Sequence, residues 1–121
     1  MSSVQEKQAK LVNALIKSSQ NGKIKWEPWE EEPGCVVTRI GDKFIYLSEH
    51  RQDETDSIKL EIYADGILTD SFLDDNLSTA DEPSITNENW YLTMTALLQK
   101  ARRLATGADD ALDSLLKDLG A

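Results

Sequence analysis

The spacing of apolar residues changes twice along this chain, and those changes restrict the fold more than any other feature. Between residues 35 and 72 apolar and polar residues alternate, which is the two-residue period of a β-strand. On both sides of this segment the apolar residues recur every three or four positions, which is the period of a helix. Grouped strands with helices at both ends are typical of an α+β domain. We therefore predict an N-terminal helix, an antiparallel meander of four to five strands and two C-terminal helices, with the first and second helices packed on one face of the sheet.

The first helix is predicted over residues 3–20. Ser3 and Glu6 have the spacing of a capping box, in which each side chain bonds to the backbone amide of the other residue. The helix is expected to end at Asn21-Gly22, because both residues tolerate positive φ.

The strands are predicted from alternation and from the turns between them. Gly41-Asp42 and Asp65-Gly66 are hairpin signals. The expected strands are 35–40, 43–48, 58–63 and 67–72, with 23–27 as a candidate fifth. Polar segments at 49–56 and 73–87 are predicted to be loops.

Two helices are predicted at the C-terminus, over 90–105 and 109–119, separated by Thr106-Gly107. Residues 1–121 are thus expected to form a single domain, with 1–107 as its core and 108–121 as a short helix. In the last helix, four apolar residues share one face: Leu112, Leu115, Leu116 and Leu119. Isolated helices below roughly 12–15 residues are marginal in water, so this one must dock on its own domain or on another chain.

Composition indicates a soluble, cytoplasmic protein. A chain of 121 residues has room for one modest core. No apolar run approaches the roughly 20 residues that a membrane span needs, and the first residues do not resemble a secretory signal. Cys35 is the single cysteine, so an internal disulfide cannot form.

The net charge of −9 is unevenly distributed. Residues 1–26 hold five lysines against Glu6, giving +4, so the remainder carries −13. Residues 65–89 hold seven acids and no base. Such a field repels nucleic acid and anionic membranes, and it favours basic partners or simply keeps the protein soluble. If the acids imitated the charge of a nucleic acid, those of 65–89 should line one face.

No constellation of residues indicates catalysis. His50 follows Ser48 and Glu49, but adjacent strand residues face opposite sides, so this trio is not a catalytic triad. We expect His50 to be a loop residue facing water, and a lone histidine also argues against zinc. Cys35 is expected in the core or at a strand edge. Glycine-rich phosphate loops are lacking, so we predict a non-enzyme with no cofactor and no metal site.

Two features indicate interaction with another protein. Trp26 and Trp29 bracket Pro28, and tryptophan is enriched at binding hot spots, although in a small domain it also caps the core. The second feature is the leucine face of the last helix. The predicted partner-binding residues are Trp26, Trp29, Leu112, Leu115, Leu116 and Leu119.

The predicted function is a non-enzymatic interaction module, acting as an accessory, adaptor or regulatory protein. Its partner is another protein or a second copy, and neither nucleic acid nor membrane. One alternative is a homodimeric structural protein without a ligand, in which the C-terminal stripe pairs with its symmetry mate. Another is a small-molecule binder or enzyme with a site at one end of the sheet, built from Trp26, Tyr46, His50 and nearby acids.

About half of the chain resembles a group of small bacterial and bacteriophage α+β proteins. The resemblance is carried by residues 60–63, the turn at 65–66, residues 70–72, Trp90 and Tyr91, and most strongly by the tail. Residues 101–116 match the pattern A-R-R-x-A-x-G-x-D-x-A-L-D-x-L-L. The resemblance implies a bacterial or phage origin and a cytoplasmic setting, with no assigned activity, cofactor or catalytic residue.

Overall fold

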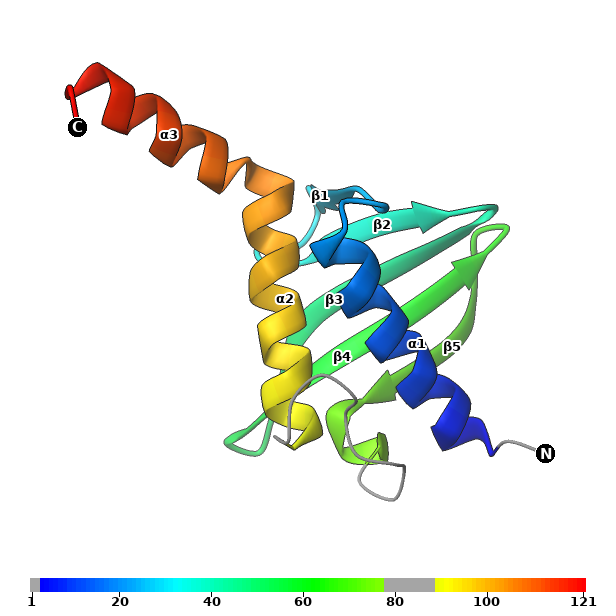
Figure 1. Ribbon diagram of the computed structural model, residues 1–121. Coiled ribbons are helices and arrows are strands. Elements are labelled where there is room, and N and C mark those ends of the chain that lie inside the picture. The colour runs from blue at the N-terminus through cyan, green and yellow to red at the C-terminus, as the bar shows by residue number, and fades with distance from the viewer. Residues whose placement is uncertain (1–2, 78–88) are drawn as a thin grey trace.

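The computed structural model describes residues 3–77 and 89–121, and these residues form the predicted α+β fold (Figure 1). The elements follow one another as α1 (Val4–Gln20), β1 (Trp26–Pro28), β2 (Val36–Ile40), β3 (Lys43–Gln52), β4 (Thr55–Ala64), β5 (Ile67–Leu73), the 3₁₀ helix η1 (Asp74–Leu77), α2 (Trp90–Thr106) and α3 (Ala108–Asp118).

The five strands form one antiparallel sheet in the order β1-β2-β3-β4-β5, so each strand pairs with its neighbours in sequence. As predicted, α1 and α2 lie on the same face of this sheet (Figure 1). Beyond the C-terminal end of α2, α3 projects away from the sheet (Figure 1). The sheet and the first two helices therefore make a two-layer body, and α3 is an arm attached to it.

Both ends of α1 lie where the sequence predicts them. The Ser3 hydroxyl accepts a hydrogen bond from the Glu6 amide at 3.1 Å, which satisfies one of the amides that lack a partner at a helix start. Asn21 caps the other end, and Gly22 follows with φ of 69°.

The core fills the space between the helices and the inner face of the sheet. Leu47 of β3 and Leu60 of β4 lie opposite each other in the strand register, and both are fully buried. Met94 of α2 and Val12 of α1 cover them from the helical layer and are equally inaccessible. One hydrophobic cluster thus unites α1, the sheet and α2.

The prediction of a loop over 49–56 is wrong. β3 and β4 continue as a hairpin to a tight turn at Asp53-Glu54, whose φ values are 51° and 65°. The ends of these strands near the turn are polar and are held by backbone hydrogen bonds. Their sequence lacks the alternation of apolar and polar residues by which a strand is predicted. His50 is consequently not a loop residue. It lies half-buried in β3, opposite Ser57.

Part of the predicted acidic loop at 73–87 is ordered as η1. Leu77 is fully buried, and Asp74 accepts a hydrogen bond from the Ile58 amide at 2.7 Å. The remainder of that loop, from residue 78 onward, lies outside the described residues.

Among the helices described, none is both long and apolar enough to cross a membrane.

Candidate functional site

The leucine stripe of α3, made of Leu112, Leu115, Leu116 and Leu119, is exposed along its whole length. The four side chains are 51%, 57%, 49% and 79% exposed. They recur at i, i+3, i+4 and i+7, so they lie on one face of the helix. Every residue from 109 to 121 is exposed, which leaves the stripe uncovered by its own domain. Exposed apolar surface that is contiguous marks interaction sites in soluble proteins.

The joint between α2 and α3 fixes the direction in which the arm points. Gly107 caps α2 in the left-handed conformation, with φ of 67° and ψ of 33°, and α3 begins at the next residue. Arg103 and Asp109 form an ion pair across this joint. The same contact lowers the pKa of the Asp109 carboxyl, first through the hydrogen bond from Arg103 and then through its charge. A single-residue joint closed by an ion pair holds α3 as an extension rather than folded back.

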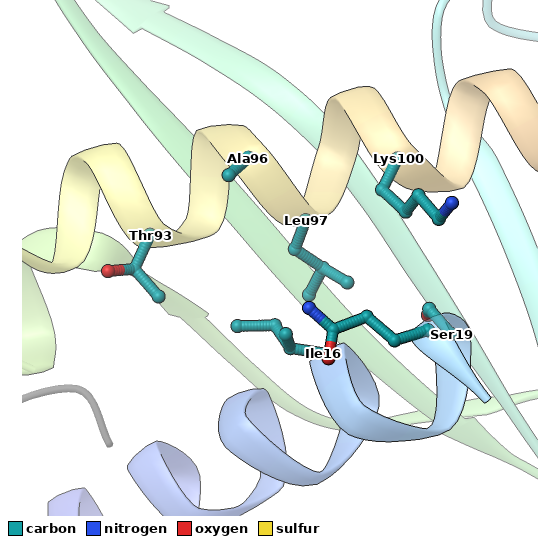
Figure 2. Close-up of a pocket in the computed structure, with 7 residues that line it drawn as sticks. Ile16, Ser19, Thr93, Ala96, Leu97 and Lys100 are labelled. Carbon is teal, nitrogen blue, oxygen red and sulfur yellow. The ribbon is translucent and has the colours of Figure 1, made fainter. Parts of the chain in front are cut away.

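A second surface is the helix groove, a hollow of about 280 Å³ between α1 and α2 (Figure 2). Ile16 of α1 and Leu97 of α2 point into the space between the two helices (Figure 2). Its volume lies just below the roughly 300–1,000 Å³ typical of small-molecule sites. The lining is mainly apolar and consists of Ile16, Ser19, Gln20, Thr93, Ala96, Leu97 and Lys100.

The charged residue in the lining of the helix groove is Lys100 of α2. The two arginines of α2 are paired, Arg102 with Glu49 and Arg103 with Asp109, and Lys7 of α1 lines a different hollow. The three α1 lysines are exposed, and none forms an ion pair with a described acid: Lys7, Lys10 and Lys17. The groove therefore combines a mainly apolar lining with one positive charge, that of Lys100.

The two predicted tryptophans lie in different environments. Trp26 is only 2% exposed, and its indole N–H donates to the Ser19 hydroxyl at 2.9 Å, so it belongs to the core. Trp29 is half-buried and packs edge-on against Tyr46, at 5.2 Å between ring centroids. Tyr46 in turn packs against Tyr63 at 5.1 Å. The structure does not bring either tryptophan together with the leucine stripe.

Trp29 helps to line a second hollow, which we call the aromatic hollow and which encloses about 460 Å³. Tyr46, Tyr63 and three glutamates share it, and Cys35 lies beside them. Burial, followed by the charges of Glu32 and Glu61, raises the pKa of the Cys35 thiol to about 11. The thiol is therefore protonated at neutral pH, which is unsuitable for nucleophilic chemistry.

The residues weighed for a small-molecule site do not converge. Trp26 is in the core, Tyr46 lines the aromatic hollow, and His50 lines a separate hollow beside Asp53 and Ser57. Within residues 3–77 and 89–121, no group of three or more histidine, cysteine or carboxylate side chains is arranged to hold a metal ion.

The described acids of 65–89 have different roles. Asp70 accepts a hydrogen bond from Gln8 at 3.1 Å, and Asp74 is buried beneath β4. Asp65 occupies the β4–β5 turn with φ of 54°. Two of these acids thus serve the fold itself, and three others, Asp81, Glu82 and Glu88, lie outside the described residues.

Sequence reasoning identified the leucine stripe but not the helix groove. Ile16 lies beside the apolar positions of the first helix, and its spacing carries no signal that it lines a hollow with Ala96 and Lys100. Comparisons with protein-family models, with curated proteins and with solved structures find no match to this chain. The resemblance of the tail to bacterial and phage proteins stays a prediction.

Proposed function

We propose that this protein is a non-enzymatic interaction module and that α3 is the element through which it binds its partner. The observation that carries the proposal is the leucine stripe, four leucines that share one helix face and are all about half exposed or more. The other two described α-helices bury most of their apolar residues against the sheet, and their large exposed apolar residues are Val4, Leu92 and Leu104.

The energetics of α3 support this role. The helix has 11 residues, below the roughly 12–15 at which isolated helices become marginal in water. Complete burial of a leucine side chain contributes about 1.5–3 kcal/mol. The four leucines are 49–79% exposed, so burying the accessible part supplies a corresponding share of this free energy for holding α3 helical and attaching it to another surface.

The test compares the full-length chain with a chain ending at Thr106 and with Leu112→Ser/Leu116→Ser. Each purified protein is examined by sedimentation for self-association, and each tagged form is used to capture proteins from a lysate of the source organism. We expect the full-length chain to associate stoichiometrically, with itself or with another protein, and both altered forms to lose that association. Asp110→Ala/Ser114→Ala, on the polar face of α3, is the matched control and should associate normally.

Folding must be checked in parallel by urea denaturation. Because α3 contributes no buried residue, its loss should leave the unfolding midpoint of the α1–α2 body almost unchanged. If the truncated chain folds and associates as the full-length chain does, α3 is not the binding element.

A further inference from the structure

We propose that the partner of α3 is a second copy of this chain and that the two copies exchange arms. The α3 of each copy lies in the helix groove of the other, with the leucine stripe facing Ile16, Ala96 and Leu97. The inference rests on the proposed function, because it requires α3 to be a binding element, and it adds the identity of the partner and the surface that receives the arm.

The two surfaces match in length and spacing. On the α2 side the groove is lined at i, i+3, i+4 and i+7 by Thr93, Ala96, Leu97 and Lys100. The leucine stripe has the same spacing, from Leu112 to Leu119. At about 1.5 Å per residue, each set spans about 10 Å of helix, so two turns of α3 can pack along two turns of α2.

The shape of the groove suits a helix carrying leucines. Ala96 has the smallest side chain of the lining and is exposed, so a second helix can approach α2 closely at that point. Ile16 forms the opposite wall from α1, and Leu97 lies between them at the base (Figure 2). An apolar side chain entering this space meets aliphatic groups on both sides.

Charge also favours this pairing. α3 carries four aspartates against Lys117, whereas the lining of the groove holds Lys100 and no acid. In a protein of net charge −9, Lys100 gives the groove a local positive charge. An acidic helix seated there gains attraction from Lys100.

The joint explains why the arm must leave its own domain. With Gly107 left-handed and Arg103 paired to Asp109, α3 extends away from the groove of its own chain (Figure 1). In two copies related by a twofold axis, each groove is occupied by the α3 of the other copy, and no arm or groove is left free to bind a third copy. The assembly therefore closes at a dimer.

The experiment uses the full chain and two single substitutions that separate arm from groove. Leu116→Asp damages the arm and leaves the groove intact, whereas Ala96→Glu blocks the groove and leaves the arm intact. Ala14→Glu, at an exposed position of α1 outside the groove, is the matched control for the second substitution. Mass is measured by sedimentation and by light scattering, and folding is checked by circular dichroism.

We expect the wild type and Ala14→Glu to have twice the 13.5 kDa mass of one chain, and both Leu116→Asp and Ala96→Glu to be monomers. An equimolar mixture of the two monomeric variants should then form heterodimers, because the intact arm of one fits the intact groove of the other. These heterodimers should dissociate at higher protein concentration than the wild-type dimer, since only one of the two contacts is formed and the dissociation constant is therefore larger. Raising the salt from about 0.05 to 0.5 M should weaken the wild-type dimer.

Other outcomes separate this inference from the proposed function. A dimeric Ala96→Glu beside a monomeric Leu116→Asp would show that α3 pairs elsewhere, for example with the other α3, and would overturn arm exchange alone. A monomeric wild type would also overturn arm exchange alone if α3 still captured a different protein. A dimer that survives Leu116→Asp and truncation at Thr106 would overturn both.

Discussion

Arg103 in the last turn of α2 forms an ion pair with Asp109 in the first turn of α3, so a charged contact closes across the left-handed Gly107. Both side chains are largely accessible to water, and exposed pairs of this kind contribute little to the free energy of unfolding. The Arg103–Asp109 ion pair should instead affect the direction in which α3 points relative to α2.

Replacing Asp109 with Asn should widen the distribution of α2–α3 angles without unfolding the protein. Spin labels at Gln99→Cys and Ser114→Cys, in protein diluted with unlabelled chains, would report this as a broader range of distances in pulsed electron resonance. Asp110→Asn removes a neighbouring exposed charge that forms no ion pair with a described residue, so it should leave the distribution unchanged. Equal broadening in both variants would mean that Arg103 does not orient α3.

Acid should have the same effect as Asp109→Asn. The pair lowers the pKa of Asp109 below its ordinary value of 3.8, so the contact is complete at neutral pH and is lost only as the pH falls through that lowered pKa. Carboxyl carbon shifts in an NMR titration would follow this, and Asp109 should titrate at lower pH than it does in a variant carrying Arg103→Gln.

Ser19→Ala should destabilise the protein by about 1–3 kcal/mol, because it leaves the buried indole N–H of Trp26 without its acceptor. Urea denaturation measures this loss, and Ser18→Ala, one position earlier, serves as the control. In a Trp26→Phe background the donor is gone, so Ser19→Ala should cost much less. An equal cost in both backgrounds would assign the loss to the bond from Ser19 to the Leu15 carbonyl instead.

Asp74 should respond differently to Asn and to Ala. Its pKa is raised chiefly by burial, so the charged form is disfavoured in the folded protein, and Asp74→Asn should be neutral or stabilising at pH 7. Asp74→Ala leaves the Ile58 amide without a partner and should cost about 1–3 kcal/mol.

The pH dependence of Asp74 follows from the same shift. The folded wild type takes up a proton more readily than the unfolded chain, so this residue's contribution rises as the pH falls from the raised pKa towards 3.8. Any advantage of Asp74→Asn over the wild type should shrink over that range. Unfolding free energies measured at several pH values would test this, and an advantage that stays constant would argue against a charged, buried Asp74.

Cys35 should be unreactive in the folded protein. With its pKa raised to about 11, its thiolate fraction at pH 8 is about 100-fold below that of a thiol at the ordinary value of 9.0. Alkylation by iodoacetamide, with and without denaturant, measures the ratio. Because the folded state holds the proton more tightly, this residue's contribution to stability should fall as the pH rises above about 9. Fast alkylation of the folded chain would contradict the burial of the thiol.

The Asp53-Glu54 turn offers a stabilising change. Both residues adopt positive φ, which costs a residue with a side chain roughly 1–2 kcal/mol. Asn-Gly is the preferred pair for such a turn, so Asp53→Asn/Glu54→Gly should raise the unfolding free energy by about 1 kcal/mol. Thermal and urea denaturation would detect it. Asp65→Asn, beside Gly66 in a turn that already has its glycine, should give a smaller gain.

These residues also show how far the sequence alone predicts the fold. The turns at Asp65-Gly66 and Gly41-Asp42 are predictable because glycine marks positive φ, and the C-cap at Gly107 follows the same logic. The N-cap at Ser3 is predictable for another reason, since its hydroxyl can accept a hydrogen bond from the Glu6 amide. The hairpin end at Asp53-Glu54 carries no such marker. Its strands are polar there, so neither alternation nor turn chemistry distinguishes it from a loop.

The candidate site was predictable only in part. Periodicity is a local property, and it was sufficient to identify the leucine stripe. The helix groove arises from the angle between α1 and α2, which lie about 80 residues apart in sequence and are placed by the sheet beneath them. The separation of Trp26 from Trp29 likewise depends on which face of the sheet each reaches.

The sequential order of the strands has a consequence during synthesis. All five strands have been made once the ribosome passes Leu73, and each can pair with the one before it, so the sheet can form from local contacts. The face that α2 covers, however, stays open until residues 90–101 emerge. At a translation rate of about 5–20 residues per second, the apolar side chains of that face stay exposed for roughly 1–6 s before α2 has been made. Slow codons within this interval would therefore prolong the stage at which the nascent chain is most exposed to aggregation.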